Sequence, residues 1–321
     1  MQIQIQNLEK TITDHDYSSA AIKGTIINDT TINDESFFVR YEDKYILNLS
    51  QYYRILDLVE RKMTPAYGDR LREDNNISFT LIESTYLDSN DFCFYKNHIL
   101  SKPIRQKIRI RSYAPMNIKE DNNYLLELKQ KEFQQTQKSR FVINQLMYDD
   151  LINKGKWPAW SEELIALNLK LKEKKLYKRY QLAHQLFEEL HLIKSIKVGY
   201  VRQAFEADGI RITFDRNVYS PPLEEKEKLS FCEFEKMNPD ILNLAGDLLK
   251  KYGQQGGDEE VIMELKYKNN NDDDSMNVRW PFELLGQEKL QKTSFSKYCY
   301  FMTKHILSSS NQMNSIKGMI Q

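Results

Sequence analysis

The chain has 321 residues, of which 40% are hydrophobic and 12% aromatic, a composition too apolar for a disordered protein. Lysine plus arginine and aspartate plus glutamate both total 46, so the net charge of zero gives no overall attraction for polyanions. Any basic site must therefore come from the local arrangement of residues. No segment reaches the roughly 20 apolar residues of a membrane span, and the first ten residues lack the features of a secretory signal.

Three cysteines, Cys93, Cys232 and Cys299, are far apart and lack the spacing of metal ligands. We therefore expect a cytoplasmic protein with reduced, buried thiols and no membrane span. Nucleic acid is not an expected partner, because the basic and aromatic residues do not form an exposed stacking platform.

The patterns in chain order predict one domain between two polar ends. Residues 1–36 form a polar leader, residues 37–306 carry the periodic segments, and residues 307–321 form a loose tail. Within the domain, apolar residues at helical spacing predict helices over three stretches. These are residues 50–63, a helical segment over about residues 140–192, and residues 294–307.

One strand pattern recurs between these helices. In RQKIRIRSY, residues 105–113, cations occupy four alternate positions, with Ile108 and Ile110 between them. Because a strand places alternate residues on opposite faces, one face is cationic and the other largely apolar. Taken alone, such a strand can also be a solvated edge strand whose charges discourage pairing. Four more segments repeat the pattern with charges of both signs: residues 37–47, 123–133, 209–217 and 261–268.

These strands predict an α+β fold, a closed antiparallel β-barrel with a charged lumen, jacketed by helices. The helices need an apolar surface to cover, and the apolar strand faces provide it. Closing the sheet removes its edges and turns the charged faces inward. A lumen of charges is costly when empty and dry, so we expect an anionic ligand with a divalent cation. Phosphate oxygens pair with arginine and lysine, and together with carboxylates they suit Mg²⁺ or Mn²⁺.

In this order the segments resemble the catalytic domain of the vacuolar transporter chaperone (VTC) family, within the triphosphate tunnel metalloenzyme group. The resemblance covers roughly residues 37–306 and is carried by Glu-x-Lys motifs at Glu42, Glu127 and Glu264, with KIRIRSY, YVRQAFE and FSKY between or after them. It implies a metal-dependent polyphosphate polymerase that uses ATP, diphosphate and polyphosphate, with Mn²⁺ or Mg²⁺ as cofactor. Two alternatives remain: a hydrolase of triphosphate or polyphosphate, and a non-catalytic sensor of polyphosphate or inositol phosphate.

The resemblance also implies three groups of site residues. The catalytic cations would be Lys44, Arg109, Arg111, Arg202 and Arg211. The substrate-binding residues would be Lys129, Lys138, Lys266, Ser296 and Lys297. The metal would be held by Glu264, helped by Glu127 or Asp215. Simpler explanations remain open, since the carboxylates and lysines can form cross-strand ion pairs, Ser296 can cap a helix, and Lys138 can be solvated near a helix start.

Overall fold

The computed structural model describes most of the predicted domain. It covers residues 40–66, 80–114, 124–133, 135–168, 173–221, 260–268 and 280–305. The predicted leader and tail, and Cys232, lie outside these ranges. Cys93 and Cys299 are free thiols.

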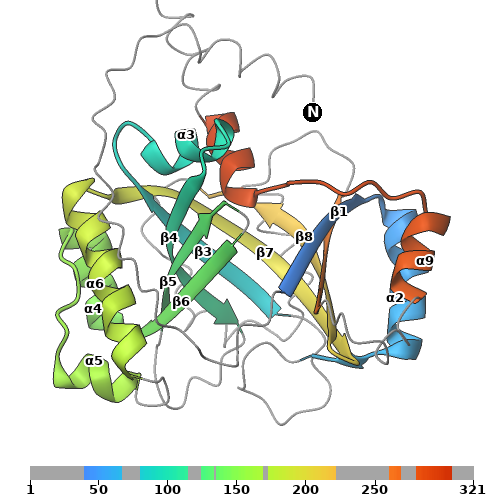
Figure 1. Cartoon of the computed structure of the whole chain (residues 1–321), viewed down its shortest axis with the longest axis horizontal. Coiled ribbons are helices and arrows are strands. Elements are labelled where there is room, and N and C mark those ends of the chain that lie inside the picture. The colour runs from blue at the N-terminus through green and yellow to red at the C-terminus, as the bar shows by residue number, and fades with distance from the viewer. Residues whose placement is uncertain are drawn as a thin grey trace, which may run out of the picture.

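In the described part of the chain, the strands form one antiparallel sheet of nine (Figure 1). Eight strands follow the order β1-β9-β8-β7-β3-β4-β5-β6, and the short β2 (Thr64–Pro65) pairs with β7. Their bounds are β1 (Arg40–Leu47), β3 (Thr80–Asp88), β4 (Ile104–Ala114), β5 (Tyr124–Glu132), β6 (Gln135–Ile143), β7 (Ile193–Ala207), β8 (Ile210–Tyr219) and β9 (Val261–Lys268). The predicted mixture of helices with a large antiparallel sheet is confirmed.

Strand pairing does not close this sheet into the predicted barrel. Within the described strands, β1 and β6 end the order and do not pair with each other. The sheet instead curls, since Glu42 of β1 comes within 4.0 Å of Lys129 of β5, near the opposite end of the order. Neighbouring strands of a sheet are each rotated by a similar angle, so a wide sheet accumulates such a curl. Charged side chains, rather than ladder hydrogen bonds, therefore meet across the gap.

Helices pack against the sheet in three places, two of them on the apolar faces of the strands. On one side, α4 (Gln145–Lys154), α5 (Glu162–Leu167) and α6 (Glu173–Glu189) pack on the apolar residues of β4, β5 and β6. On the other, α2 (Leu49–Lys62) and α9 (Trp280–Gln287) cover β1, β8 and β9. The short α3 (Cys93–Ile99) and the C-terminal helix, residues 297–305, pack against β3 and β7. None of the described helices combines the length and apolar composition needed to cross a membrane.

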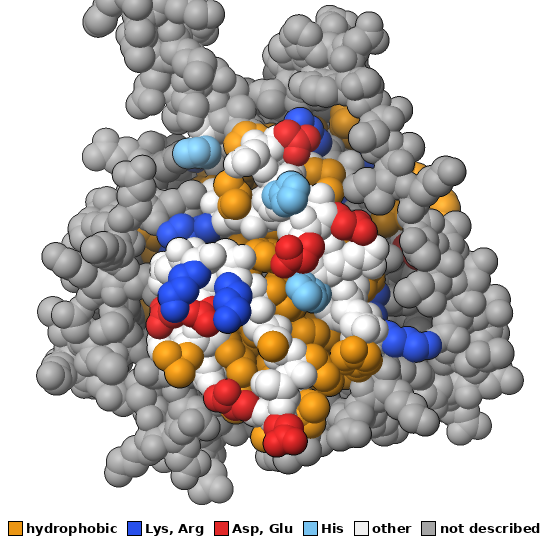
Figure 2. All heavy atoms as spheres, turned by 90° about the vertical axis from the view of Figure 1, so that its left-hand side faces the viewer, with side chains coloured by type: hydrophobic (Ala, Val, Ile, Leu, Met, Phe, Trp, Pro, Cys, Tyr) orange, Lys and Arg blue, Asp and Glu red, His pale blue; other side chains and the backbone are white. Residues whose placement is uncertain are grey.

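The face formed by α4, α5 and α6 carries charges of both signs. Figure 2 shows acidic and basic side chains interspersed with hydrophobic ones there. The described part of this face therefore presents no continuous basic patch.

The helical segment predicted from about residue 140 starts too early. Arg140 to Ile143 belong to β6, where Phe141 and Ile143 are fully buried at alternate positions. The first helix of the segment begins only at Gln145, and the Asn144 side chain caps it by accepting a hydrogen bond from the Met147 amide at 2.9 Å. Lys138 consequently lies on a strand rather than near a helix start.

Candidate functional site

Cations lie directly opposite one another across β4, β5 and β6. Lys107 pairs in register with Lys129, and Lys129 pairs with Lys138. Like charges at such positions destabilise a sheet. Burial and neighbouring cations lower the pKa of Lys129 to about 8 and the pKa of Lys138 to about 6. This cationic row therefore has a high electrostatic cost in the free protein, and an anion bound beside it would reduce that cost.

Glu127 of β5 lies on the same face as Lys129, two residues earlier in the strand, and is the centre of a second cluster. Its side chain is only 1% exposed, and its carboxylate lies 2.6 Å from Arg109 Nε, 2.6 Å from Lys138 Nζ and 2.8 Å from Arg140 Nε. Arg111 follows at 3.9 Å. Although burial acts in the opposite direction, these cations hold the pKa of Glu127 well below its usual range. Glu127 is thus the counter-ion that keeps several cations together.

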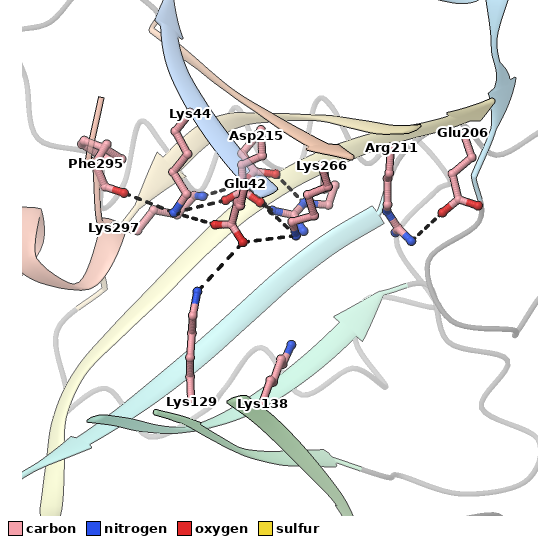
Figure 3. Close-up of polar contacts among 12 residues, drawn as sticks. Glu42, Lys44, Lys129, Lys138, Glu206, Arg211, Asp215, Lys266, Phe295 and Lys297 are labelled. Atoms are coloured by element: carbon pink, nitrogen blue, oxygen red, sulfur yellow. Dashed lines mark hydrogen bonds and ion pairs between the residues drawn. The ribbon is translucent and has the colours of Figure 1, made fainter. Parts of the chain in front are cut away.

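Asp215 of β8 does the same for two other cations on the charged face, several strands away in the sheet order. Arg202 donates to both of its carboxylate oxygens, at 2.5 and 2.7 Å, and Lys297 of the C-terminal helix donates at 2.5 Å (Figure 3). Asp215 is fully buried, and despite that burial Arg202 and Lys297 lower its pKa. The paired Arg202 and Lys297 are therefore fixed in place before any ligand binds.

Glu264 of β9 has looser contacts with its cations. Its carboxylate lies 3.4 Å from Lys266 Nζ and 3.6 Å from both Lys44 Nζ and Arg202 Nη2. Only 7% of the residue is exposed, and although burial acts in the opposite direction, Lys44 and Arg202 keep its pKa well below its usual range. Glu264 is therefore ionised, and its oxygens are less closely occupied than those of the two carboxylates above.

Two further oxygen donors accompany Glu264. Glu42 of β1 shares its cations, lying 3.2 Å from Lys44 and 3.9 Å from Lys266 (Figure 3). Thr213 of β8 pairs in register with Glu264, and its buried Oγ1 has no hydrogen-bond partner in the described ranges. Carboxylate and hydroxyl oxygens are the hard ligands that Mg²⁺ and Mn²⁺ prefer. Glu264 with Glu42 and Thr213 thus offers a donor set that fits such a cation.

The structure divides the predicted site residues into two groups joined by Lys129. One group surrounds Glu264 and Asp215, with Lys44, Arg202, Lys266 and Lys297. The other surrounds Glu127, with Arg109, Arg111 and Lys138. Lys129 extends from the second group toward Glu42 of the first (Figure 3).

Some predicted residues lie elsewhere or have a second role. Arg211 turns away from the Glu264 group and donates to Glu206 at 2.7 Å (Figure 3). Ser296 accepts a hydrogen bond from Lys107 Nζ at 2.9 Å and another from the Cys299 amide at 3.4 Å, so its hydroxyl also acts as a helix cap. Of the predicted metal ligands, Glu264 and Asp215 lie in one group and Glu127 lies in the other. The described residues hold no group of three acidic, histidine or cysteine side chains suited to a metal ion.

Sequence reasoning assigned no role to Glu42, Lys107 or Thr213. Glu42 and Lys107 were visible as members of alternating charged faces, in RYEDKY and RQKIRIRSY. Thr213 has no such signal, because an uncharged hydroxyl on a strand stands out only once its cross-strand partner Glu264 is known.

Comparisons with known structures give remote likenesses. A protein from Bacillus halodurans, provisionally assigned as an adenylate cyclase, is 11% identical with a TM-score of 0.42, over 79% of this chain and 92% of that one. The PH1819 protein from Pyrococcus horikoshii is 13% identical with a TM-score of 0.36, over 83% of this chain and 99% of that one. At these identities and scores neither likeness carries information on function.

The sequence comparisons are more specific. No curated protein matches the chain. A model of the VTC domain family matches residues 39–305, which is most of the chain and includes every residue of the site described above. The resemblance drawn from the strand motifs is confirmed, and the chain belongs to the VTC domain family.

Proposed function

We propose that this protein is a polyphosphate polymerase that transfers the γ-phosphate of ATP to a growing polyphosphate chain. The opposed cations Lys107, Lys129 and Lys138 carry the proposal, because an anion with several charges would relieve their mutual repulsion. Membership of the VTC domain family supports phosphoryl transfer as the class of reaction.

The donor oxygens favour Glu264 and Glu42 as the site for Mg²⁺ or Mn²⁺. Asp215 and Glu127 are poorer candidates, because cations already lie 2.5–2.8 Å from their carboxylates. At Glu264 the cations stand at 3.4–3.6 Å, and the Thr213 hydroxyl is close by in register. A divalent cation bound there would offset charge on the triphosphate of ATP.

The cations around the two tight carboxylates would act on the phosphates. Arg202 and Arg109 are held by Asp215 and Glu127, so their guanidinium groups need little reorganisation when substrate binds. Such groups stabilise the charge that develops on the leaving diphosphate. Lys129 and Lys138 would position the incoming phosphate chain for in-line attack on the γ-phosphorus.

A tunnel is part of the proposal. The contact of Glu42 with Lys129 supports it, because charged side chains of β1 and β5 approach each other where strand pairing leaves the sheet open. A chain that grows by addition of phosphate at one end would then extend along the charged face of the sheet.

The test is incubation of the purified protein with ATP and Mn²⁺, with and without diphosphate. A polyphosphate gel and a free-phosphate assay are run on the same samples. The proposal predicts a ladder of products that disappears in Glu264→Gln and persists in Asp57→Asn, an exposed change on α2. Phosphate release without a ladder would instead indicate a hydrolase. Binding of polyphosphate without turnover would indicate a sensor.

A further inference from the structure

Two cations continue the charged face of β4 and β5 beyond Lys107 and Lys129. Arg105 and Lys131 are direct cross-strand partners, and both side chains are partly exposed. Since alternate residues of a strand share a face, this outer pair lies on the same face as the inner cationic row. Its neighbour on β6 is Thr136, which is uncharged.

Within the described ranges, no acidic side chain lies opposite Arg105 or Lys131 on their face of β4, β5 and β6. No ion pair of Arg105 or Lys131 occurs within the described part of the chain, and the buried Nε of Arg105 has no hydrogen-bond partner there. The adjacent Glu132 pairs with Ile104 and therefore lies on the opposite face. On β5 the carboxylate of this face is Glu127, which lies four residues before Lys131 and is already surrounded by cations.

The cations of this face also change the charge state of a residue on the neighbouring helix α3. Burial, together with Lys107 and Arg105, lowers the pKa of His98 on α3 to about 3. His98 is therefore neutral at physiological pH and does not add to the repulsion. Among the described residues, the outer end of this face is thus a region of positive potential, because the row of Arg105, Lys131 and Thr136 holds no carboxylate.

We propose that Arg105 and Lys131 form an outer subsite for polyphosphate, filled only by chains long enough to extend past the inner cations. The inference rests on the proposed function, because the inner row must hold a polyanion first. Two residues along a strand span roughly 7 Å, so the outer pair lengthens the cationic path by about that distance. Tripolyphosphate bound at the inner cations would not need this pair, whereas a long chain would contact it.

The experiment compares two ligands by titration calorimetry on the full chain, namely tripolyphosphate and a long-chain polyphosphate. In the double variant Arg105→Gln, Lys131→Gln, the affinity for the long chain should fall about tenfold, since two partly exposed ion pairs each contribute a few-fold. The affinity for tripolyphosphate should stay within about twofold. A matched control, Lys154→Gln with Lys156→Gln, removes the same charge from the exposed end of α4 and should leave both affinities unchanged.

The outcomes separate this inference from the proposed function. Equal losses for both ligands, or no loss for either, would refute the outer subsite while wild-type binding and turnover still support the polymerase. A wild-type protein that binds neither ligand would refute both. Thermal unfolding of the double variant should match the wild type, and Arg105→Lys with Lys131 intact should retain most of the long-chain affinity.

Discussion

Replacing Glu127 by glutamine should destabilise the free protein, and a polyanion should restore part of the loss. The neutral amide keeps the shape of the side chain but leaves Arg109, Arg111, Lys138 and Arg140 without their shared counter-ion. Breaking a buried ion pair by removing one partner costs about 3–5 kcal/mol. The sequence motif around Glu127 gave it a metal-binding role, so the variant also separates these two explanations.

The expected cost lies at the lower end of that range. The side chains of Lys138 and Arg140 are 32% and 37% exposed, so water screens part of their repulsion. Lys138, whose pKa is lowered to about 6, can also release its proton. We therefore expect a loss of about 3 kcal/mol in the free energy of unfolding, which lowers the melting temperature by about 6 °C in a domain of this size.

Differential scanning fluorimetry with and without tripolyphosphate tests this reasoning. The ligand should raise the melting temperature of Glu127→Gln more than that of the wild type, because it supplies the missing negative charge. Asp57→Asn, which removes a carboxylate from an exposed pair with Arg61, should leave the melting temperature unchanged. An unchanged melting temperature in Glu127→Gln would refute the counter-ion role. Loss of Mn²⁺-dependent turnover at wild-type stability would favour metal binding.

Lys129→Arg should flatten the pH dependence of tripolyphosphate binding. In the wild type the affinity should fall as pH rises through about 8, where Lys129 loses its proton, and titration calorimetry between pH 7 and 9 would show it. Glu264→Gln should abolish Mn²⁺-dependent turnover in an activity assay but leave the binding of tripolyphosphate without metal unchanged, because the substitution removes no cation. Loss of both turnover and binding would contradict this expectation. Asp88→Asn should cost about 1–3 kcal/mol in chemical denaturation, because the buried carboxylate accepts hydrogen bonds from the Phe94 and Tyr95 amides and from the Tyr298 hydroxyl.

Alternation along the chain predicted the charged strand faces well, because period 2 assigns each residue to a face without any knowledge of tertiary structure. Ile108 and Ile110 are buried beneath the helices, while Arg109 between them lies in the charged cluster. Alternation was missed in SRFVI, where the strand from Gln135 to Ile143 runs directly into the residues that cap α4. There, the two-residue period of the strand changes to the helical period within a few residues, and the predicted helix began too early in the chain.

Closure of the sheet lay beyond such reasoning. Whether two end strands pair depends on the twist accumulated over the whole sheet and on the positions of the strand ends, neither of which is encoded in a single segment. The end strands β1 and β6 are joined by no ladder in the described ranges, although Glu42 and Lys129 meet at 4.0 Å. The sequence therefore predicts which face is charged better than it predicts how far that face is enclosed.

The Glu-x-Lys motifs show most clearly why a residue type does not determine its role. Glu127 lies in register between Arg109 and Arg140, so its two nearest cross-strand neighbours are guanidinium groups that bind it tightly. Glu264 lies between Thr213 and Lys44, a hydroxyl and a single cation, and its oxygens remain more open. The same tripeptide, Glu-Leu-Lys, thus holds cations tightly together at Glu127 and contacts them only loosely at Glu264. The difference arises from strand order and register, which bring together residues that are distant in the sequence.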